Sequence, residues 1–172
     1  MIRLISELYR YRALIKALVI RHLSIRYRGS LLGFLWSFLN PLCLMLVYAV
    51  VFRYYIRFSE VQNYTVFLFC GLLPWIWFSS GLSEGTSSIV SGGHLITKSM
   101  FPAQILPTVA VLTQLVHFIL ALPLLFIFMA IAGMEFHSTI ALLPLLLLVQ
   151  LVFTSGLALA LGSLNVQFRD VQ

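Results

Sequence analysis

The sequence predicts an all-α integral membrane protein, in which four transmembrane helices follow a basic amphipathic helix that lies at the membrane surface. Hydrophobic residues make up 61% of the 172 residues and charged residues 9%, whereas soluble domains have about 45–50% and about 25%. A soluble fold could not cover so much apolar surface with so few charges, so lipid must surround most of the chain. The connectors between the four apolar segments are too short to hold a soluble domain.

The positive charge of the chain is concentrated at its N-terminus. Seven of the eleven Lys and Arg residues lie in the first 28 positions, namely Arg3, Arg10, Arg12, Lys16, Arg21, Arg26 and Arg28. A basic chain can bind nucleic acid, but these cations adjoin an apolar segment of spanning length. We therefore expect an anionic membrane surface as their partner and no nucleic acid.

Residues 1–30 are accordingly expected to form a cytoplasmic interfacial lead-in, and residues 31–172 the transmembrane domain. The cations of the lead-in do not share one helical face, so a break near Tyr9–Arg12 and a second helix over about 13–25 fit better than one continuous helix. Membrane anchoring is the first interpretation and docking of a cytoplasmic partner the second. The cations expected at the cytoplasmic membrane surface are Arg21, Arg26 and Arg28.

The spans are expected at about 31–52, 64–90, 105–132 and 139–164. The first has 22 residues and would reach about 33 Å, enough for a hydrocarbon core of about 30 Å. It is longer than a signal-peptide core of about 7–15 residues, and no small-residue cleavage site follows, so we expect a retained span. Pro41 predicts a kink within it.

The second span is expected to continue past the point where hydropathy ends it. Hydropathy alone would stop this helix near Leu82, because residues 79–88 are mostly small and polar. Such residues suit a helix that packs inside a bundle. The helix is therefore expected to extend to about Val90.

The distribution of Lys and Arg over the short flanks predicts the orientation. A cytoplasmic N-terminus places nine cations inside, including Lys98 and Arg169, and leaves Arg53 and Arg57 outside. The connector over residues 91–104 then faces the cytoplasm. The connectors expected outside are residues 53–63 and 133–138.

Four stretches in this order carry a family resemblance: Arg26–Leu42, Tyr64–Ile96 with its Gly71-Leu72-Leu73-Pro74-Trp75 motif, Lys98–Pro107 with Phe101-Pro102, and Leu164–Val171. Together they resemble the membrane subunit of type-2 ABC transporters that export polysaccharides or polyol phosphates, such as O-antigen, capsule or teichoic acid precursors. The resemblance covers essentially the whole chain.

The sequence departs from this family in two ways. The family usually has six spans, so we expect this chain to be truncated after the fourth. The family often has a charged pair after Phe-Pro, where this chain has Ala103-Gln104. A salt contact made by that pair in relatives is therefore expected to be absent here.

The resemblance implies an ATP-driven exporter in the bacterial inner membrane, which moves a glycan on a polyprenyl pyrophosphate or similar lipid. Two permease copies would form the channel as a homodimer, and two ATPase subunits would bind them from the cytoplasm. The chain has no G-x-x-x-x-G-K-[ST] phosphate loop. We therefore expect no catalytic site and no cofactor on this chain, with ATP and Mg bound by the partner ATPase.

The cytoplasmic connector is the candidate for coupling to that ATPase. The resemblance implies that a short helix over residues 92–102 fits a cleft on the ATPase. Apolar side chains that faced water there would require a partner, and the alternative is a tight connector that dips into the membrane interface. The candidate coupling residues are Leu95, Ile96, Lys98, Met100 and Phe101.

The second span holds the candidates for pathway or helix-packing roles, which are Trp75, Trp77, Ser80 and Glu84. A carboxylate within a span is costly, so Glu84 suggests a function; the alternatives are an ion pair with Arg26 or Arg28, or a place in water at the cytoplasmic end. Trp75 and Trp77 lie on different helix faces, so at most one can line a channel that stacks sugars. Ordinary packing or an interfacial aromatic belt is the alternative for both.

Other functions predict other patterns. A membrane enzyme that acts on lipid-linked sugars would need carboxylates or histidines gathered at one membrane face, but the five acidic residues are scattered and the four histidines lack metal-ligand spacing. No metal site is therefore expected. A passive channel or structural subunit would need no coupling loop, so binding of an ATPase through residues 92–102 would separate it from the exporter.

Overall fold

The computed structural model describes residues 2–27, 35–51, 63–99 and 101–168, and within them it contains helices and no strand. The helices are α1 (Ile2–Arg10), α2 (Arg12–Tyr27), α3 (Trp36–Val51), α4 (Tyr64–Ser91), α5 (Gly93–Ser99), α6 (Ile105–Ile131), the 3-10 helix η3 (Ser138–Leu142) and α7 (Leu143–Gln167). The predicted all-α class is confirmed.

Three of these helical segments are long and apolar enough to cross a membrane: Tyr64–Ser91, Ile105–Ile131 and Ser138–Gln167. They match three of the four predicted spans. The remaining predicted span, over residues 31–52, is described only where it forms α3. The 16 residues of α3 would reach about 24 Å, and both ends of the predicted span lie outside the described residues. Pro41 lies inside α3 without ending the helix.

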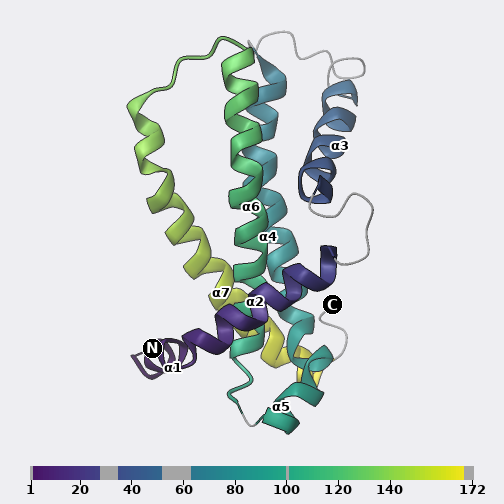
Figure 1. The fold of residues 1–172 in the computed structure, drawn as a ribbon, viewed down its shortest axis with the longest axis vertical. Helices are drawn as coiled ribbons and strands as arrows, with labels where there is room; N and C mark the ends of the chain where they lie inside the picture. The colour runs from purple at the N-terminus through teal and green to yellow at the C-terminus, as the bar shows by residue number, and fades with distance from the viewer. Residues whose placement is uncertain (1, 28–34, 52–62, 100, 169–172) are drawn as a thin grey trace.

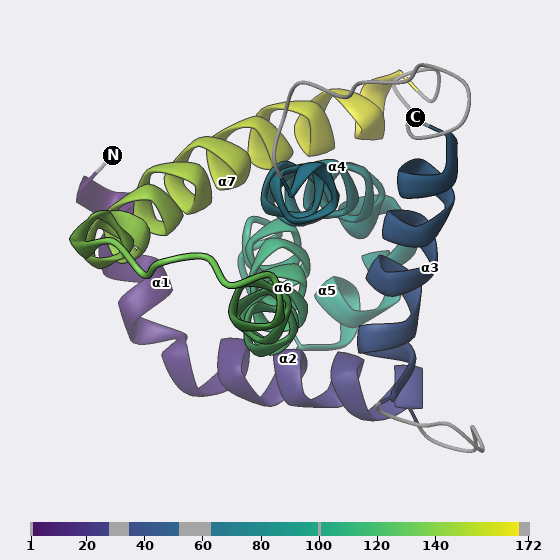
Figure 2. The same cartoon turned by 90° about the horizontal axis from the view of Figure 1, so that it is seen from above.

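α4 and α6 stand side by side at the centre of the molecule (Figure 1). Seen from above, α7, α3 and α2 surround this pair, each on a different side (Figure 2). The first core cluster fills the space between α3, α4 and α6, with Phe69, Leu73 and Trp77 of α4 packed against Phe118 and Leu125 of α6. The other helices therefore pack around α4 and α6.

α4 and α7 approach closely because small residues line their contact. A Cβ atom placed on Gly85 would lie 2.7 Å from the Cβ of Ala158, and one on Gly162 would lie 3.3 Å from the Gly85 carbonyl oxygen. Gly81 and Gly85 are four residues apart on α4, as are Ala158 and Gly162 on α7. This spacing is the one that lets membrane helices bring their backbones together.

The lead-in consists of two helices, as the sequence predicted. α1 ends at Arg10 and α2 begins at Arg12, so the break falls in the predicted Tyr9–Arg12 interval. α2 crosses α6 near the end of the bundle that carries α5 (Figures 1 and 2). Its Ile15 and Leu18 are buried in a second core cluster with residues of α6.

Candidate coupling and pathway site

A short helix stands between α4 and α6, where a coupling element was expected. The α4 helix closes with a hydrogen bond from the Gly92 backbone N–H to the Ser88 carbonyl oxygen (2.9 Å), and α5 opens with one from Leu95 N–H to the Gly92 carbonyl oxygen (2.9 Å). A Cβ on Gly92 would lie 2.8 Å from the Ser88 oxygen and 2.5 Å from Leu106 Cδ1. Only glycine therefore allows this tight turn against α6.

The described apolar side chains of this segment, Leu95, Ile96 and Phe101, pack within the chain and do not all face water. Leu95 and Ile96 are half-buried and pack on the second core cluster, and Phe101 is only 6% exposed within it. The physical reason is that this cluster, which combines residues of α2 and of the start of α6, offers these side chains an apolar partner within the same chain. The exposed face of α5 is polar instead and includes His94 and Thr97.

Two candidate coupling residues are not placed by the structure. Met100 lies outside the described residues, and only the backbone of Lys98 is described, as part of α5. No contact within this chain tests the coupling role of these residues.

A polar contact ties the start of α6, directly after the coupling segment, to the lead-in, and the sequence reasoning missed it. The Gln104 Nε2 donates a hydrogen bond to Glu7 Oε2. Gln104 follows Phe101-Pro102 at the start of α6, where the family often has a charged pair. Glu7 is the only acidic residue of the first 28, and that isolation was the signal that could have drawn attention to it.

The two tryptophans of α4 are separated as predicted. Trp77 is 1% exposed, its Nε1 donates to the Val111 carbonyl oxygen (3.4 Å), and its ring lies 5.4 Å from that of Phe118. It therefore packs α4 against α6. Trp75 is 62% exposed on another face and lies 5.9 Å from the ring of Phe78, so it is the tryptophan that could meet a lipid or a substrate.

Ser80 and Glu84 lie on the side of α4 that carries Trp77, since positions three and seven residues further along an α-helix return to the same face. Both side chains are half-buried. Glu84 is seven residues before the end of α4, or about 10 Å along the axis. Trp75 is on a different side, so the four candidates do not form one constellation.

Buried amides join α7 to α4 inside the bundle. The Asn165 Nδ2 donates to the Thr86 carbonyl oxygen (3.1 Å), and the Gln150 Nε2 donates to the Pro74 carbonyl oxygen (2.8 Å). These two bonds hold the lower and middle parts of the helix pair. They also show how Asn165, which is buried, and Gln150, which is half-buried, are tolerated in an otherwise apolar helix, because both amides donate to a backbone carbonyl.

The expected surface cations are only partly placed. Arg21 is exposed on α2, the side chain of Arg26 is not described, and Arg28 lies outside the described residues. The proposed ion pairs of Glu84 with Arg26 or Arg28 therefore also lie outside what is described. Within the described residues no group of three or more His, Cys, Asp or Glu side chains is placed to hold a metal ion.

The fold defines a multi-pass membrane protein, with three helical segments long and apolar enough to span a membrane and a short helix between two of them. Residues 13–172 match the family model described as ABC-2 type transporter. The chain therefore belongs to the membrane subunits of the ABC-2 transporter family.

The chain is 48% identical over all 172 residues to the "O-antigen export system permease protein RfbA" of Myxococcus xanthus, and this match covers 66% of that protein. Two proteins of the same description from Klebsiella pneumoniae are 35% and 33% identical over 153 residues, which is 88% of this chain and 59% of each relative. The chain thus spans about three fifths to two thirds of the length of these relatives.

Proposed function

We propose that this chain acts as the permease subunit of an ATP-driven exporter, which moves lipid-linked polysaccharide of the O-antigen, capsule or teichoic acid type across the bacterial inner membrane. The observation that carries the proposal is the 48% identity over the whole chain to a relative described as an O-antigen export permease. Because that description names O-antigen, O-antigen is the cargo that we favour among these polysaccharides.

The proposal assigns the remaining roles to partners. A separate ABC ATPase binds ATP and Mg and supplies the energy, and a second copy of the permease completes the channel. The N-terminus lies in the cytoplasm, because nine cations flank the spans on that side against two on the other. α5 then faces the cytoplasm, where an ATPase can reach it.

The contact with the ATPase is proposed to involve the polar face of α5. Leu95 and Ile96 are already packed against the second core cluster, so a docked ATPase would meet His94 and Thr97 first. The second core cluster contains residues of α2 and α6, and Leu95 and Ile96 of α5 pack against it. The hydrogen bond between Gln104 and Glu7 joins the start of α6 to α1. A movement of α5 would thereby be passed through this cluster to α6 and the lead-in.

The test is co-purification with the ATPase subunit of the same export system in mild detergent. The variant His94→Glu/Thr97→Glu adds charge on the exposed face of α5 without touching the buried cluster. We expect recovery of the ATPase to fall about tenfold or more, as for loss of an interface hot spot. The matched control is His137→Glu/Thr139→Glu, the same exposed residue types at the opposite end of the bundle, which should leave recovery unchanged.

Two results would count against the proposal. Equal recovery with both variants would remove α5 from the ATPase contact. Absence of binding, both by this chain and by a chimera that also carries the part of the Myxococcus relative outside the match, would contradict the permease role itself.

A further inference from the structure

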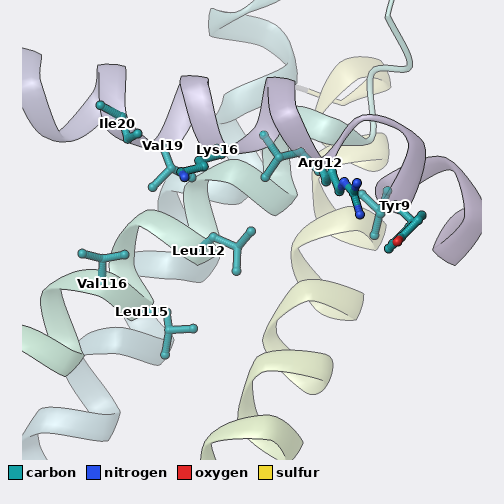
Figure 3. Close-up of a pocket in the computed structure, with 10 residues that line it drawn as sticks. Tyr9, Arg12, Lys16, Val19, Ile20, Leu112, Leu115 and Val116 are labelled. Atoms are coloured by element: carbon teal, nitrogen blue, oxygen red, sulfur yellow. The ribbon is translucent and has the colours of Figure 1, made fainter.

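A pocket of about 600 Å³ lies between the lead-in and α6. Its walls come from α1, α2 and α6, and Figure 3 shows the lining side chains of α1 and α2 above those of α6. The volume falls within the range of about 300–1,000 Å³ that is usual for small-molecule sites. The pocket is separate from α5 and from the candidates on α4.

The pocket is apolar inside and cationic at one edge. Leu112, Leu115 and Val116 line it from α6, while Arg12 and Lys16 line it from α2. The two cations are four residues apart, so they lie one turn from each other on the same face of the helix. No carboxylate is among the ten lining residues, and the one acidic residue of the lead-in, Glu7, is engaged by Gln104.

Tyr9 positions the first of these cations. The Arg12 guanidinium carbon lies 4.6 Å from the centre of the Tyr9 ring, which is within the range of a cation–π contact. That contact holds the guanidinium, with its N–H groups, beside Tyr9, and both residues line the pocket. A planar guanidinium presents those N–H groups as a fork that matches phosphate oxygens.

The direction of the pocket matches a lipid in a bilayer. α2 lies across the bundle near one end, and the apolar wall follows α6 away from that end towards the middle of the bundle (Figures 1 and 3). A lipid with its headgroup at α2 would therefore place its chain along α6. Cationic pockets between membrane helices close to the membrane surface commonly bind lipid headgroups.

We propose that this pocket binds a membrane glycerophospholipid with an anionic headgroup. Its phosphate lies between Arg12 and Lys16, and one acyl chain lies against Leu112, Leu115 and Val116. Charge complementarity selects this occupant, because an apolar helix of a second copy would bury two cations without a partner, which is costly. The inference does not depend on the proposed export function.

Binding is tested by titrating the purified protein in detergent with phosphatidylglycerol and with phosphatidylcholine, with bound lipid counted by native mass spectrometry. Arg12→Gln/Lys16→Gln should weaken phosphatidylglycerol binding about 30-fold at low salt, from about fivefold for each cation, and should leave phosphatidylcholine binding unchanged. The control Arg10→Gln/Arg21→Gln removes the same charge from exposed positions outside the pocket and should have little effect.

Two outcomes of the titration would overturn the proposal. Equal weakening by the two pairs of substitutions would show a diffuse surface attraction instead of a site. Preferred binding of a polyprenyl phosphate, lost in Arg12→Gln/Lys16→Gln, would assign the pocket to a carrier lipid.

The acyl chain is tested on the unmodified protein with a phosphatidylglycerol that carries a photoreactive group in its acyl chain. We expect cross-links to be enriched in the peptide with residues 112–116. The comparison is the exposed apolar face of α7, where Leu145, Leu146 and Leu148 are exposed and do not line this pocket. Labelling of α7 that equals or exceeds that of residues 112–116 would contradict the proposal.

Discussion

At the scale of single residues, glycines decide how closely the helices approach. Gly85 sits where any side chain would meet the backbone-attached Cβ of Ala158, whereas a Cβ on Gly71 of the same helix would meet nothing within 4 Å. An alanine methyl cannot rotate away, so relief of the clash would require the two helix backbones to separate. The two glycines therefore make a matched pair for testing the α4–α7 contact.

Gly85→Ala is expected to lower the free energy of unfolding by about 1–3 kcal/mol, the usual cost of overpacking. Gly71→Ala should be neutral or slightly stabilising, because alanine is the better helix former. The measurement is the thermal midpoint in detergent, followed by fluorescence-detected size-exclusion chromatography. The double variant Gly85→Ala/Ala158→Gly should recover most of the loss, and a failure to recover would mean that the clash lies elsewhere.

The tryptophans show the limit of a residue-by-residue reading. Their spacing of two along a helix established that Trp75 and Trp77 occupy different faces. Which of them is buried depends on where α6 lies, because the partners of Trp77 are Val111 and Phe118. Those partners are more than 30 residues away in the chain, and the local sequence contains no sign of them.

At the scale of elements, the lead-in is held to the bundle by one face of α2. Ile15 is 8% exposed within the second core cluster, while Ile25 on the same helix is 61% exposed. The same cluster includes Leu95, Ile96 and Phe101, so α2 and the coupling segment share one apolar core. Loss of that core should release both.

Ile15→Ala is expected to destabilise the docking of the lead-in by about 2–5 kcal/mol, the range for large-to-small changes in a core. The measurement is the rate at which trypsin cleaves after the cations of α1 and α2, which should rise. Ile25→Ala removes the same atoms from an exposed position and should leave the rate unchanged. Similar rates for the two variants would argue against a docked lead-in.

The ends of helices could be predicted from the sequence where the local composition determines them. The small residues after Leu82 predicted a helix that continues inside a bundle, and α4 runs to Ser91. The inward face of α5 could not be predicted in the same way. An apolar residue in a short connector can face a partner protein or a neighbouring helix, and only the position of α2 decides between the two.

At the scale of the whole molecule, the cations set the orientation that we propose. α5 and η3 lie in connectors at opposite ends of the central helices (Figure 1). The cation-rich lead-in contacts the end that carries α5. The positive-inside rule then places α5 in the cytoplasm and η3 outside.

This orientation is tested with single cysteines after Cys43 and Cys70 are replaced by alanine. In intact spheroplasts, a membrane-impermeant maleimide is expected to label Thr139→Cys, which lies in η3, and not Thr97→Cys in α5. Both positions are exposed in the structure. After the membrane is opened, Thr97→Cys should label as well, and the reverse order of labelling would contradict a cytoplasmic N-terminus.

The sequence by itself determined the all-α membrane class, three described spans, the break in the lead-in and the family, because hydropathy, helix periodicity and motif order are local or cumulative properties of a chain. The tertiary structure decided which tryptophan is buried, which way the residues of the coupling segment face, and how Glu7 meets Gln104. It also assembled the pocket of Arg12 and Lys16 against Leu112. The tryptophan, Glu7 and pocket contacts join residues about 30 to 100 positions apart, and such partners meet only when the helices pack.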